Sequence, residues 1–311
     1  MGLEFGLAID LARPAAPGER QARQVRALIE LAEITGFRSV WAGDQYIDHP
    51  STIHLPAPLL VLANLASQTS LRLGTGILVL PAYQPLRLAY EAALLDRLSE
   101  GRLTLGVGVG SPQLAQRFGV EPAQVGDFID DALAALRALW RGSDGFQGKM
   151  LTIEGGIHPL PLTPGGPPVW VAGTIGRSVR RAARWGDGWY AGMHYSYETI
   201  VRQVARYRDA LTAEGKDASQ PTVAMNRLLV LAPTRDEALE AGGAAVEPAA
   251  IAADVPSQFV GTPAQVVATI RQYASAGVTN MQFRVLPASM SYQHAARTMR
   301  LFADEVLPML G

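Results

Sequence analysis

The chain has 311 residues, of which 48% are hydrophobic and 18% charged, so a large core is expected and long disordered stretches are not. The formal net charge of −1 gives no basic surface for nucleic acid or anionic lipid, and no apolar run is long enough to span a membrane. The sequence contains no cysteine, which excludes disulfides and thiolate metal sites and fits a cytoplasmic protein.

Strand-like and helix-like segments alternate through the first half of the chain. A short apolar strand is predicted at 3–9, and a helix follows at 18–36, where apolar residues recur at helical spacing and Gly36 closes the helix. The next predicted pairs of strand and helix are 38–43 with 58–69, 71–80 with 85–101, and 102–110 with 124–142.

The alternation pauses at 143–167, which is rich in Gly and Pro and is predicted to be an insertion with a short hairpin. The predicted pairs then continue as 167–173 with 176–186, and 187–192 with 196–215. A strand at 222–233 is followed by a long Ala/Gly-rich stretch, 234–260, and by a helix at 262–277. The stretch has the length of a mobile lid, and its Ala/Gly content fits a mobile segment and a loose helix equally. The last pair is 278–286 with 291–310.

Eight apolar strands, each followed by a helix, predict a single-domain α/β protein with a (β/α)₈ TIM barrel. The insertion falls after the fourth helix and the long segment after the seventh strand. A doubly wound open sheet is the alternative, and it would need a glycine fingerprint after its first strand. The stretch "GVGVGS" at 106–111 has Ser111 where the third glycine belongs, so the dinucleotide-binding alternative fails.

The carboxyl ends of the strands carry the active site in barrels of this kind. The candidates that this rule selects are Asp10, Asp44, Gln45, residues 80–83, Gly110, Ser111, residues 173–176, His194, Asn226 and Arg227. Asp44 draws attention because the apolar run Val40–Trp41–Ala42–Gly43 stops at this acid.

The stretch "AGTIGRS" at 172–178 leads from a strand directly into a helix. Backbone N–H groups at a helix start bind phosphate well, so this stretch is either an anion site or a plain strand-to-helix turn. Arg180, Arg181 and Arg184 share one face of that helix, which is interpreted as a solvated outer face.

Glycines recur at 74, 76, 106, 108 and 110 in the third and fourth strands. They either clear room for a flat ligand or relieve crowding between side chains, and the residues alone do not separate these interpretations. A metal site at Asp48, His49 and His54 is not favoured, because the spacing matches no standard ligand set. No metal ligand is therefore assigned.

Two long segments of the chain resemble the bacterial luciferase-like oxidoreductases. The first is "RLGTGILVLPAYQPLRLAYEAALLDRLSEGRLTLGVGVGSP" at 72–112, and the second is "PPVWVAGTIGRSVRRAARWGDGWYAG" at 167–192. A third, "GTPAQVVATIRQYASAGVTNMQF" at 261–283, resembles the C-terminal helix and strand of that family.

The resemblance implies a barrel, a homodimer and a reduced flavin-type cofactor, either FMN or coenzyme F-420 (8-hydroxy-5-deazaflavin). It implies a non-proline cis peptide at Gly76–Ile77 under the cofactor ring and a phosphate site at 172–177. The cofactor-binding residues that it implies are Asp44, Gly76, Ile77, Gly110, Ser111, Ala172, Gly173, Thr174, Gly176 and Arg177.

The resemblance also gives Asp44 a role. Family members carry an acid at this strand end, usually followed by histidine, and Asp–His is common among the deazaflavin enzymes. Here Gln45 follows Asp44, and glutamine cannot shuttle a proton near neutral pH. Asp44 and Gln45 are the predicted catalytic residues, and F-420 is slightly favoured over FMN.

The predicted function is hydride transfer to, or monooxygenation of, a small organic substrate. Tyr46, Tyr83 and His194, with Met193 and Tyr195, are predicted to line the substrate pocket, although tyrosines in such loops are also ordinary packing residues. One alternative is a flavin-binding protein with little or no catalysis, which Gln45 leaves open. Another is a phosphate-sugar barrel enzyme, against which the lack of an obvious catalytic lysine or metal cluster speaks.

Overall fold

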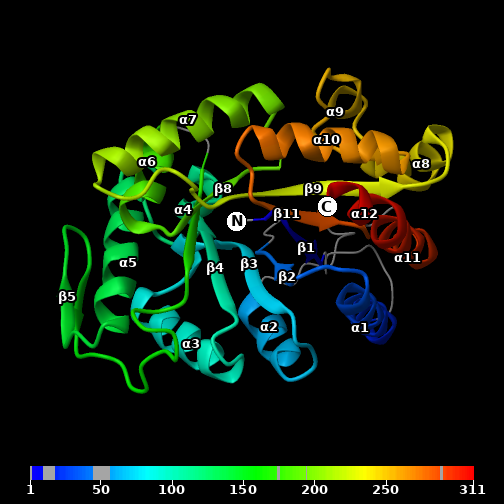
Figure 1. The fold of residues 1–311 in the computed structure, drawn as a ribbon. Coiled ribbons are helices and arrows are strands. Elements are labelled where there is room, and N and C mark those ends of the chain that lie inside the picture. Colours follow the sequence, from blue (N-terminus) through cyan, green and yellow to red (C-terminus); the bar gives the residue numbers. More distant parts are fainter. Residues whose placement is uncertain (1, 10–17, 45–56, 174–175, 194, 288–289) are drawn as a thin grey trace. The chain divides into compact units, whose positions relative to one another are not determined.

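A computed structural model describes residues 2–9, 18–44, 57–173, 176–193, 195–287 and 290–311 (Figure 1). Contacts between residues divide the chain into two compact units. Unit 1 contains residues 1–41, 47–55 and 191–311, and unit 2 contains residues 42–46 and 56–190. Each unit is built from parallel strands and the helices that follow them.

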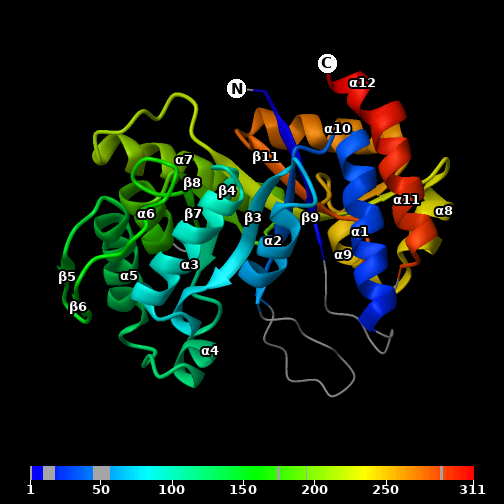
Figure 2. The ribbon, with the colours of Figure 1, turned by 90° about the horizontal axis from the view of Figure 1, so that it is seen from below.

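The sheet of unit 1 has the strand order β10-β9-β11-β1-β2, and every pairing within it is parallel. Its strands are β1 (Glu4–Ala8), β2 (Ser39–Ala42), β9 (Val223–Leu231), β10 (Phe259–Gly261) and β11 (Asn280–Arg284). Its helices are α1 (Gly18–Ile34), α7 (Tyr197–Ala213), α8 (Arg235–Gly242), α9 (Pro248–Ala252), α10 (Pro263–Ser275), α11 (Tyr292–Leu301) and α12 (Leu307–Leu310). Helices α1 and α11 lie side by side on this unit (Figure 2).

The core of unit 1 is aromatic because alternate residues of β1 and β11 point toward the helices. Phe5 of β1 stacks on Phe283 of β11 at 5.9 Å between ring centroids, and Phe302 meets Phe5 edge-on at 5.0 Å. All three rings are buried. Such pairs add about 0.5–1.5 kcal/mol each beyond the burial of their area, so the cluster fixes these strands against their helices.

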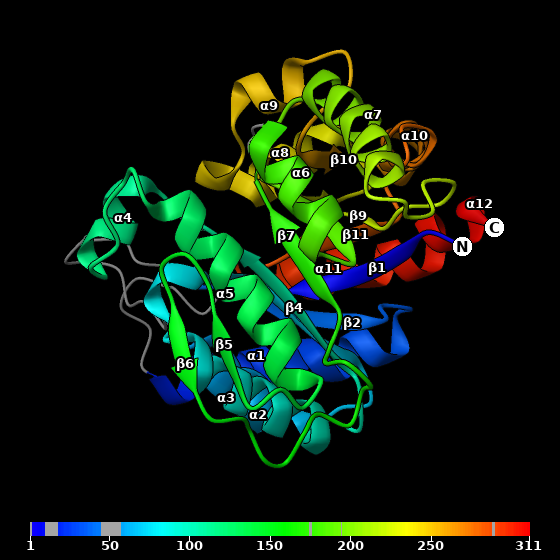
Figure 3. The ribbon, with the colours of Figure 1, turned by 90° about the vertical axis from the view of Figure 1, so that its left-hand side faces the viewer.

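The sheet of unit 2 has the strand order β3-β4-β7-β8, also parallel. Its strands are β3 (Arg72–Val79), β4 (Leu103–Gly108), β7 (Val169–Ala172) and β8 (Gly188–Ala191). Its helices are α2 (Pro58–Ala66), α3 (Pro85–Leu98), α4 (Pro112–Arg117), α5 (Val125–Trp140) and α6 (Gly176–Trp185). The insertion forms a two-stranded antiparallel hairpin, β5 (Gly145–Gln147) with β6 (Thr152–Glu154), beside α5 (Figure 3). The predicted hairpin is therefore confirmed.

In three segments the structure adds to the sequence-based predictions or differs from them. The stretch at 234–260 contains α8, α9 and β10, because Thr234 caps α8 through its hydroxyl and Pro248 begins α9. The short helix α4 follows β4 because Ser111 is an N-cap and Pro112 fits the first helical position. The C-terminal helix is interrupted by a π-helical turn, Phe302–Val306.

Candidate active site

Asp44 lies two residues after the end of β2 and is tied to β3 and the turn after it. Its backbone N–H donates to the carbonyl oxygen of Ile77 at 2.9 Å. One carboxylate oxygen, Oδ2, accepts the N–H of Val79 at 2.8 Å, and the other, Oδ1, accepts the hydroxyl of Tyr83 at 3.0 Å. The side chain is therefore fixed in orientation by the end of β3 and by the turn that follows it.

The environment of Asp44 makes it an unusually weak acid. Burial raises its pKa to about 6, although the hydrogen bonds from Val79 and Tyr83 act in the opposite direction. Desolvation therefore outweighs both donors. A carboxyl group with this pKa can hold or release a proton near neutral pH, which an ordinary aspartate does not do.

The end of β3 packs closely around this acid. The peptide bond between Gly76 and Ile77 is cis, as predicted. Gly43 lies so close to it that a Cβ at this position would be 2.5 Å from the carbonyl oxygen of Gly76. Only glycine allows this approach between the segment after β2 and the end of β3.

The glycines of β4 also have a local packing reason. A Cβ on Gly106 would lie 2.1 Å from the carbonyl oxygen of Thr75, and one on Gly108 would lie 2.4 Å from Cδ1 of Ile77. Their small size therefore lets β3 and β4 approach, which supports the packing interpretation for these two residues.

The turn between β7 and α6 presents the start of a ten-residue helix. A Cβ on Gly173 would lie 2.1 Å from Cβ of Ser178, so Gly173 lets the turn close against α6. The carbonyl oxygen of Gly173 accepts the indole N–H of Trp189 at 3.0 Å. The first turn of α6 carries no acidic residue, and Arg177 is exposed there. Such a helix start favours an anion.

The prediction of a solvated face for all three arginines of α6 was wrong for Arg181. Arg180 and Arg184 are exposed, but Arg181 is 6% exposed. Its guanidinium makes a two-pronged contact with Asp130 of α5, at 2.7 and 3.0 Å, and also donates to the carbonyl oxygen of Gly126. Sequence spacing placed Arg181 on the outer face, whereas packing of α6 against α5 buries it.

The comparisons with known proteins decide the family. The luciferase-like monooxygenase family matches residues 3–252. The chain belongs to the luciferase-like monooxygenase family. A protein of unknown activity from Sinorhizobium fredii is 32% identical over 72% of this chain and 66% of its own length. The oxygenase component of a flavin-dependent trigonelline monooxygenase from Acinetobacter baylyi is 26% identical over 76% of this chain and 67% of its own.

Solved structures agree with this assignment. Monooxygenase RslO1 from Streptomyces bottropensis is 28% identical, has a TM-score of 0.86, and is matched over 99% of this chain and 100% of its own. A coenzyme F-420-dependent tetrahydromethanopterin reductase from Methanopyrus kandleri, 18% identical with a TM-score of 0.80 over the full length of both chains, shares the fold. The predicted (β/α)₈ barrel is confirmed, with β1, β2, β3, β4, β7, β8, β9 and β11 as its eight strands.

The solved structures that share this fold include enzymes of both cofactor types. The oxygenating constituent of 3,6-diketocamphane monooxygenase from Pseudomonas putida was solved with FMN, at 20% identity, a TM-score of 0.81 and 99% coverage of both chains. The prediction that this oxidoreductase family uses FMN or F-420 is supported. The chain spans about two thirds of the length of the curated relatives it matches.

In this luciferase-like chain, Gly110 and Ser111 both have structural roles. Their contacts with a cofactor stay predictions. Gly110 has a φ of +69°, a left-handed conformation that favours glycine. The Ser111 hydroxyl accepts the backbone N–H of Leu114 at 3.1 Å and so caps α4. Ala172 is the last residue of β7, and Ile77 is half-buried beside Gly108.

The predicted catalytic, cofactor-binding and pocket residues Gln45, Tyr46, Thr174 and His194 lie outside the described residues, and so do the strand-end candidates Asp10 and Ile175. The same holds for Asp48, His49 and His54. Among the residues that the structure describes, no group of three or more His, Cys, Asp or Glu side chains is arranged to hold a metal ion. In the same part of the chain, no helix has the length and hydropathy needed to cross a membrane.

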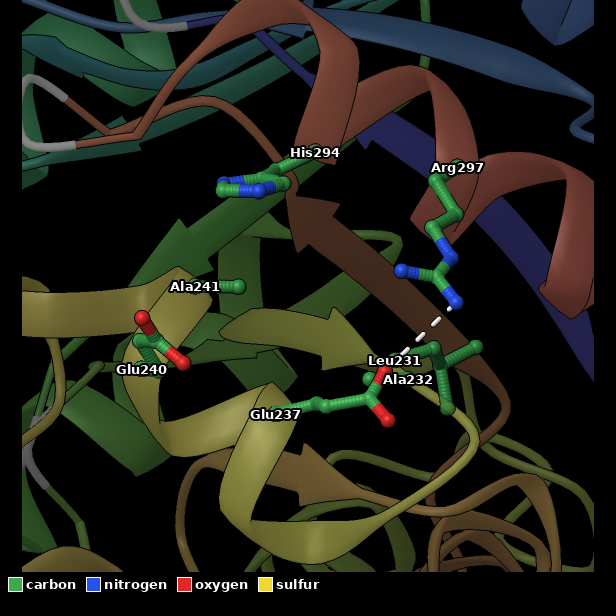
Figure 4. A pocket seen from close by; sticks show the side chains of 7 residues that line it. All are labelled: Leu231, Ala232, Glu237, Glu240, Ala241, His294 and Arg297. Atoms are coloured by element: carbon green, nitrogen blue, oxygen red, sulfur yellow. Dashed lines mark ion pairs between the residues drawn. The ribbon is translucent and has the colours of Figure 1, made fainter.

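Two pockets are lined entirely by described residues of unit 1. One lies between α8 and α11, where Glu237 and Arg297 form an ion pair at 3.5 Å and Glu240 and His294 complete the wall (Figure 4). These four side chains are exposed, so the ion pair contributes little to stability.

The other pocket contains two arginines, Arg227 of β9 and Arg284 of β11. The rule that the carboxyl ends of strands carry the site selected Arg227 from the sequence. It did not select Arg284. The signal in the sequence is an arginine that ends an apolar strand, and only the pocket around it gives that signal its meaning.

Proposed function

We propose that this luciferase-like protein is an F-420-dependent oxidoreductase that transfers a hydride to a small organic substrate. The main observation behind this proposal is the environment of Asp44. Its carboxyl group is fixed by Val79 and Tyr83, and burial raises its pKa to about 6. Hydride addition to a carbonyl carbon requires a proton for the carbonyl oxygen. Asp44 can hold that proton near neutral pH without the histidine that Gln45 replaces.

The described residues of unit 2 fit a flavin-type cofactor. The start of α6 offers the N–H groups of its first turn and the guanidinium of Arg177 to a phosphate, with no acid there to repel it. Among the described residues, each oxygen of Asp44 accepts one hydrogen bond, and a carboxylate oxygen has a second lone pair that can accept a ring N–H. When bound, reduced F-420 supplies the hydride.

The chain's own residues then have separate tasks. Asp44 holds a proton on its carboxyl group more readily than an ordinary aspartate does, because burial disfavours its charged form. Tyr83 orients the carboxyl group through its hydroxyl. Val79, whose N–H donates to this carboxyl group, is itself buried and helps to keep water from that side.

A second candidate function is FMN-dependent monooxygenation, which the relatives favour. The trigonelline monooxygenase at 26% identity is flavin-dependent, and RslO1 at 28% identity is a monooxygenase. Under this alternative the same phosphate site at α6 serves FMN.

Titration of the purified protein with FMN and with F-420, each oxidised and reduced, tests these proposals through absorbance and fluorescence. Binding of F-420 but not of FMN is the expected result. Binding of FMN alone would overturn the proposal in favour of monooxygenation, and binding of neither would sink both. A protein that binds F-420 but transfers no hydride to any of a panel of ketones and aldehydes would be a flavin-binding protein with little catalysis.

We also propose that the protein is a homodimer that associates through α2 and α3. These helices contact each other, and Leu60 of α2 and Leu94 and Leu98 of α3 are 74%, 53% and 55% exposed. Leucines exposed together on adjoining helices are typical of a protein interface. A second copy of the chain would bury them, as the family resemblance implies.

A further inference from the structure

Two amide side chains of unit 1 lie next to each other on one face of its sheet. Gln282 of β11 pairs in register with Asn226 of β9 (Figure 1). Residues that pair across neighbouring strands point to the same face of a sheet, and successive residues of a strand point to opposite faces. Phe283 follows Gln282 and stacks with Phe5 on the face that the helices cover. The two amides therefore point to the other face, which we call the inner face.

Both amide side chains are closed off from solvent. Gln282 is 1% exposed and Asn226 is 6% exposed. Their side-chain oxygens, Oε1 of Gln282 and Oδ1 of Asn226, accept no hydrogen bond from any described residue. Buried polar atoms in native proteins nearly always have a partner, either a protein group or an ordered water molecule. Two such oxygens on adjoining strands therefore indicate a shared donor.

The same row of the sheet continues from Gln282 through Gly6 of β1 to Ser39 of β2. A Cβ on Gly6 would lie 2.6 Å from the hydroxyl oxygen of Ser39, so this hydroxyl leans over Gly6 on the inner face. Ser39 is buried, and its oxygen accepts the indole N–H of Trp41 at 2.7 Å. Within the described part of the chain, the Ser39 hydroxyl donates its own proton to no acceptor. The row therefore offers one donor and two acceptors.

A water molecule matches these three groups. It has two protons for the two amide oxygens and a lone pair for the hydroxyl of Ser39, and buried waters typically make about three hydrogen bonds. A cation fits less well, because neither amide carries the negative charge that would offset its desolvation. Arg284 also lies on the inner face, two residues or about 7 Å beyond Gln282 along β11, and its positive charge would repel a second cation.

We propose that unit 1 contains an internal site for one neutral hydrogen-bond donor, a water molecule. The water donates to Oε1 of Gln282 and to Oδ1 of Asn226, and it accepts the hydroxyl of Ser39. It ties β11 to β9 and to β2 on the face opposite the aromatic cluster. The site is independent of the proposed cofactor, because all of its residues belong to unit 1.

The direct test is a crystal structure of the full-length protein at a resolution that shows ordered water. We expect a water molecule within hydrogen-bond distance of both amide oxygens and of the Ser39 hydroxyl. A direct hydrogen bond between the amides of Gln282 and Asn226, with no water between them, would overturn the proposal. So would an inner face on which both oxygens stay without a donor.

The substitution Gln282→Met gives a second test, because the two possible states of the oxygen predict effects of opposite sign. If Oε1 accepts a proton from the water, removing it should lower the folding equilibrium constant about fivefold. If Oε1 has no donor, an apolar side chain of similar size should stabilise the protein. Urea denaturation measures the change, and a Gln282→Met protein more stable than the wild type would contradict the water site.

A double-mutant cycle shows whether the two amides share one partner. The effects of Gln282→Met and Asn226→Leu on the folding equilibrium constant should not multiply, because the first substitution already weakens the hold on the water. Thr35→Val is the control for Asn226→Leu, since the buried Thr35 hydroxyl donates to Leu31 within α1. Its effect should multiply with that of Gln282→Met. Multiplication in both pairs would contradict a shared water.

The choice of water over a cation has its own test. The stability of the wild type should be the same in sodium, potassium, ammonium and tetramethylammonium chloride at equal ionic strength. Tetramethylammonium is too large for a buried site and has no proton to donate. A specific gain in stability with sodium, potassium or ammonium would overturn the assignment of a neutral donor.

Discussion

At the scale of single residues, Asp44 is held in a site that disfavours its charge. Its carboxylate accepts two hydrogen bonds, yet burial still raises its pKa to about 6. The unfolded chain would titrate Asp44 near 3.8. Between these two values the folded protein binds more protons than the unfolded chain, so stability falls as the pH rises from about 4 to about 6.

Asp44→Asn should therefore stabilise the protein at pH 8, because the amide carries no charge to desolvate and can still meet Val79 and Tyr83. We expect a gain in the free energy of unfolding on the order of 1–3 kcal/mol at pH 8, shrinking toward zero near pH 4. Urea denaturation at several pH values measures it. A variant that is less stable than the wild type at pH 8 would mean that the carboxylate is stabilising there.

Tyr83→Phe should raise the pKa of Asp44 further, because the lost hydroxyl lowers that pKa in the wild type. The carboxyl signal of ¹³C-labelled aspartate, followed by NMR during a pH titration, reports the change. Tyr90→Phe is the control, since the Tyr90 hydroxyl donates to Gly156 instead. If the titration midpoint of Asp44 is unchanged or lower in Tyr83→Phe, the Tyr83 hydroxyl does not lower the pKa of Asp44.

At the scale of elements, α6 combines an anion-binding start with a buried attachment to α5. The guanidinium of Arg181 donates two hydrogen bonds to the carboxylate of Asp130. This ion pair fixes the helix whose first turn would bind a phosphate. Desolvated charges tolerate the loss of a partner poorly. The ion pair between Arg181 and Asp130 therefore positions the helix that begins at the candidate cofactor site.

Arg181→Met should lower the free energy of unfolding by about 1–3 kcal/mol, because it leaves the carboxylate of Asp130 without this guanidinium. Arg180→Met, on the exposed side of the same helix, should change it by less than about 0.5 kcal/mol. Denaturant unfolding of both variants gives the comparison. Equal effects of the two substitutions would show that the Asp130 contact adds nothing.

The sequence predicted the elements of the barrel well and their side-chain environments less well. Strands such as β3 and β4 are apolar runs closed by glycine or proline, so their bounds follow from local chemistry. The burial of Arg181 depends on which face of α6 meets α5, and helical spacing alone does not reveal that face. Helix α4 was missed although Ser111 and Pro112 are good N-terminal signals, because the run is only six residues long.

The candidate site was predicted only in part, for a similar reason. Asp44 was selected because it follows an apolar strand, but its hydrogen bonds come from Val79, 35 residues away at the end of β3, and from Tyr83, 39 residues away and beyond the turn that follows β3. The cis bond at Gly76–Ile77 followed from family resemblance. Arg284 was missed because an arginine at the end of an apolar strand gains its meaning only from the pocket around it.

At the scale of the whole molecule, the exposed leucines of α2 and α3 bear on assembly. Leu94→Glu should shift the protein toward the monomer, because it would bury a carboxylate in the proposed interface. Val201→Glu, at a 40% exposed position on α7, is the matched control. Sedimentation velocity measures both, and a Leu94→Glu protein that sediments as the wild type would exclude this face as the interface.

The central claim is that a flavin-type cofactor binds where β2, β3 and β7 end in unit 2, with Asp44 at its ring. A crystal structure of the protein soaked with reduced F-420, or with FMN if F-420 does not bind, tests it most directly. The account predicts the phosphate on the N–H groups of the first turn of α6 and the ring within hydrogen-bond distance of Asp44. A ring bound away from Asp44, or a phosphate away from α6, would contradict it.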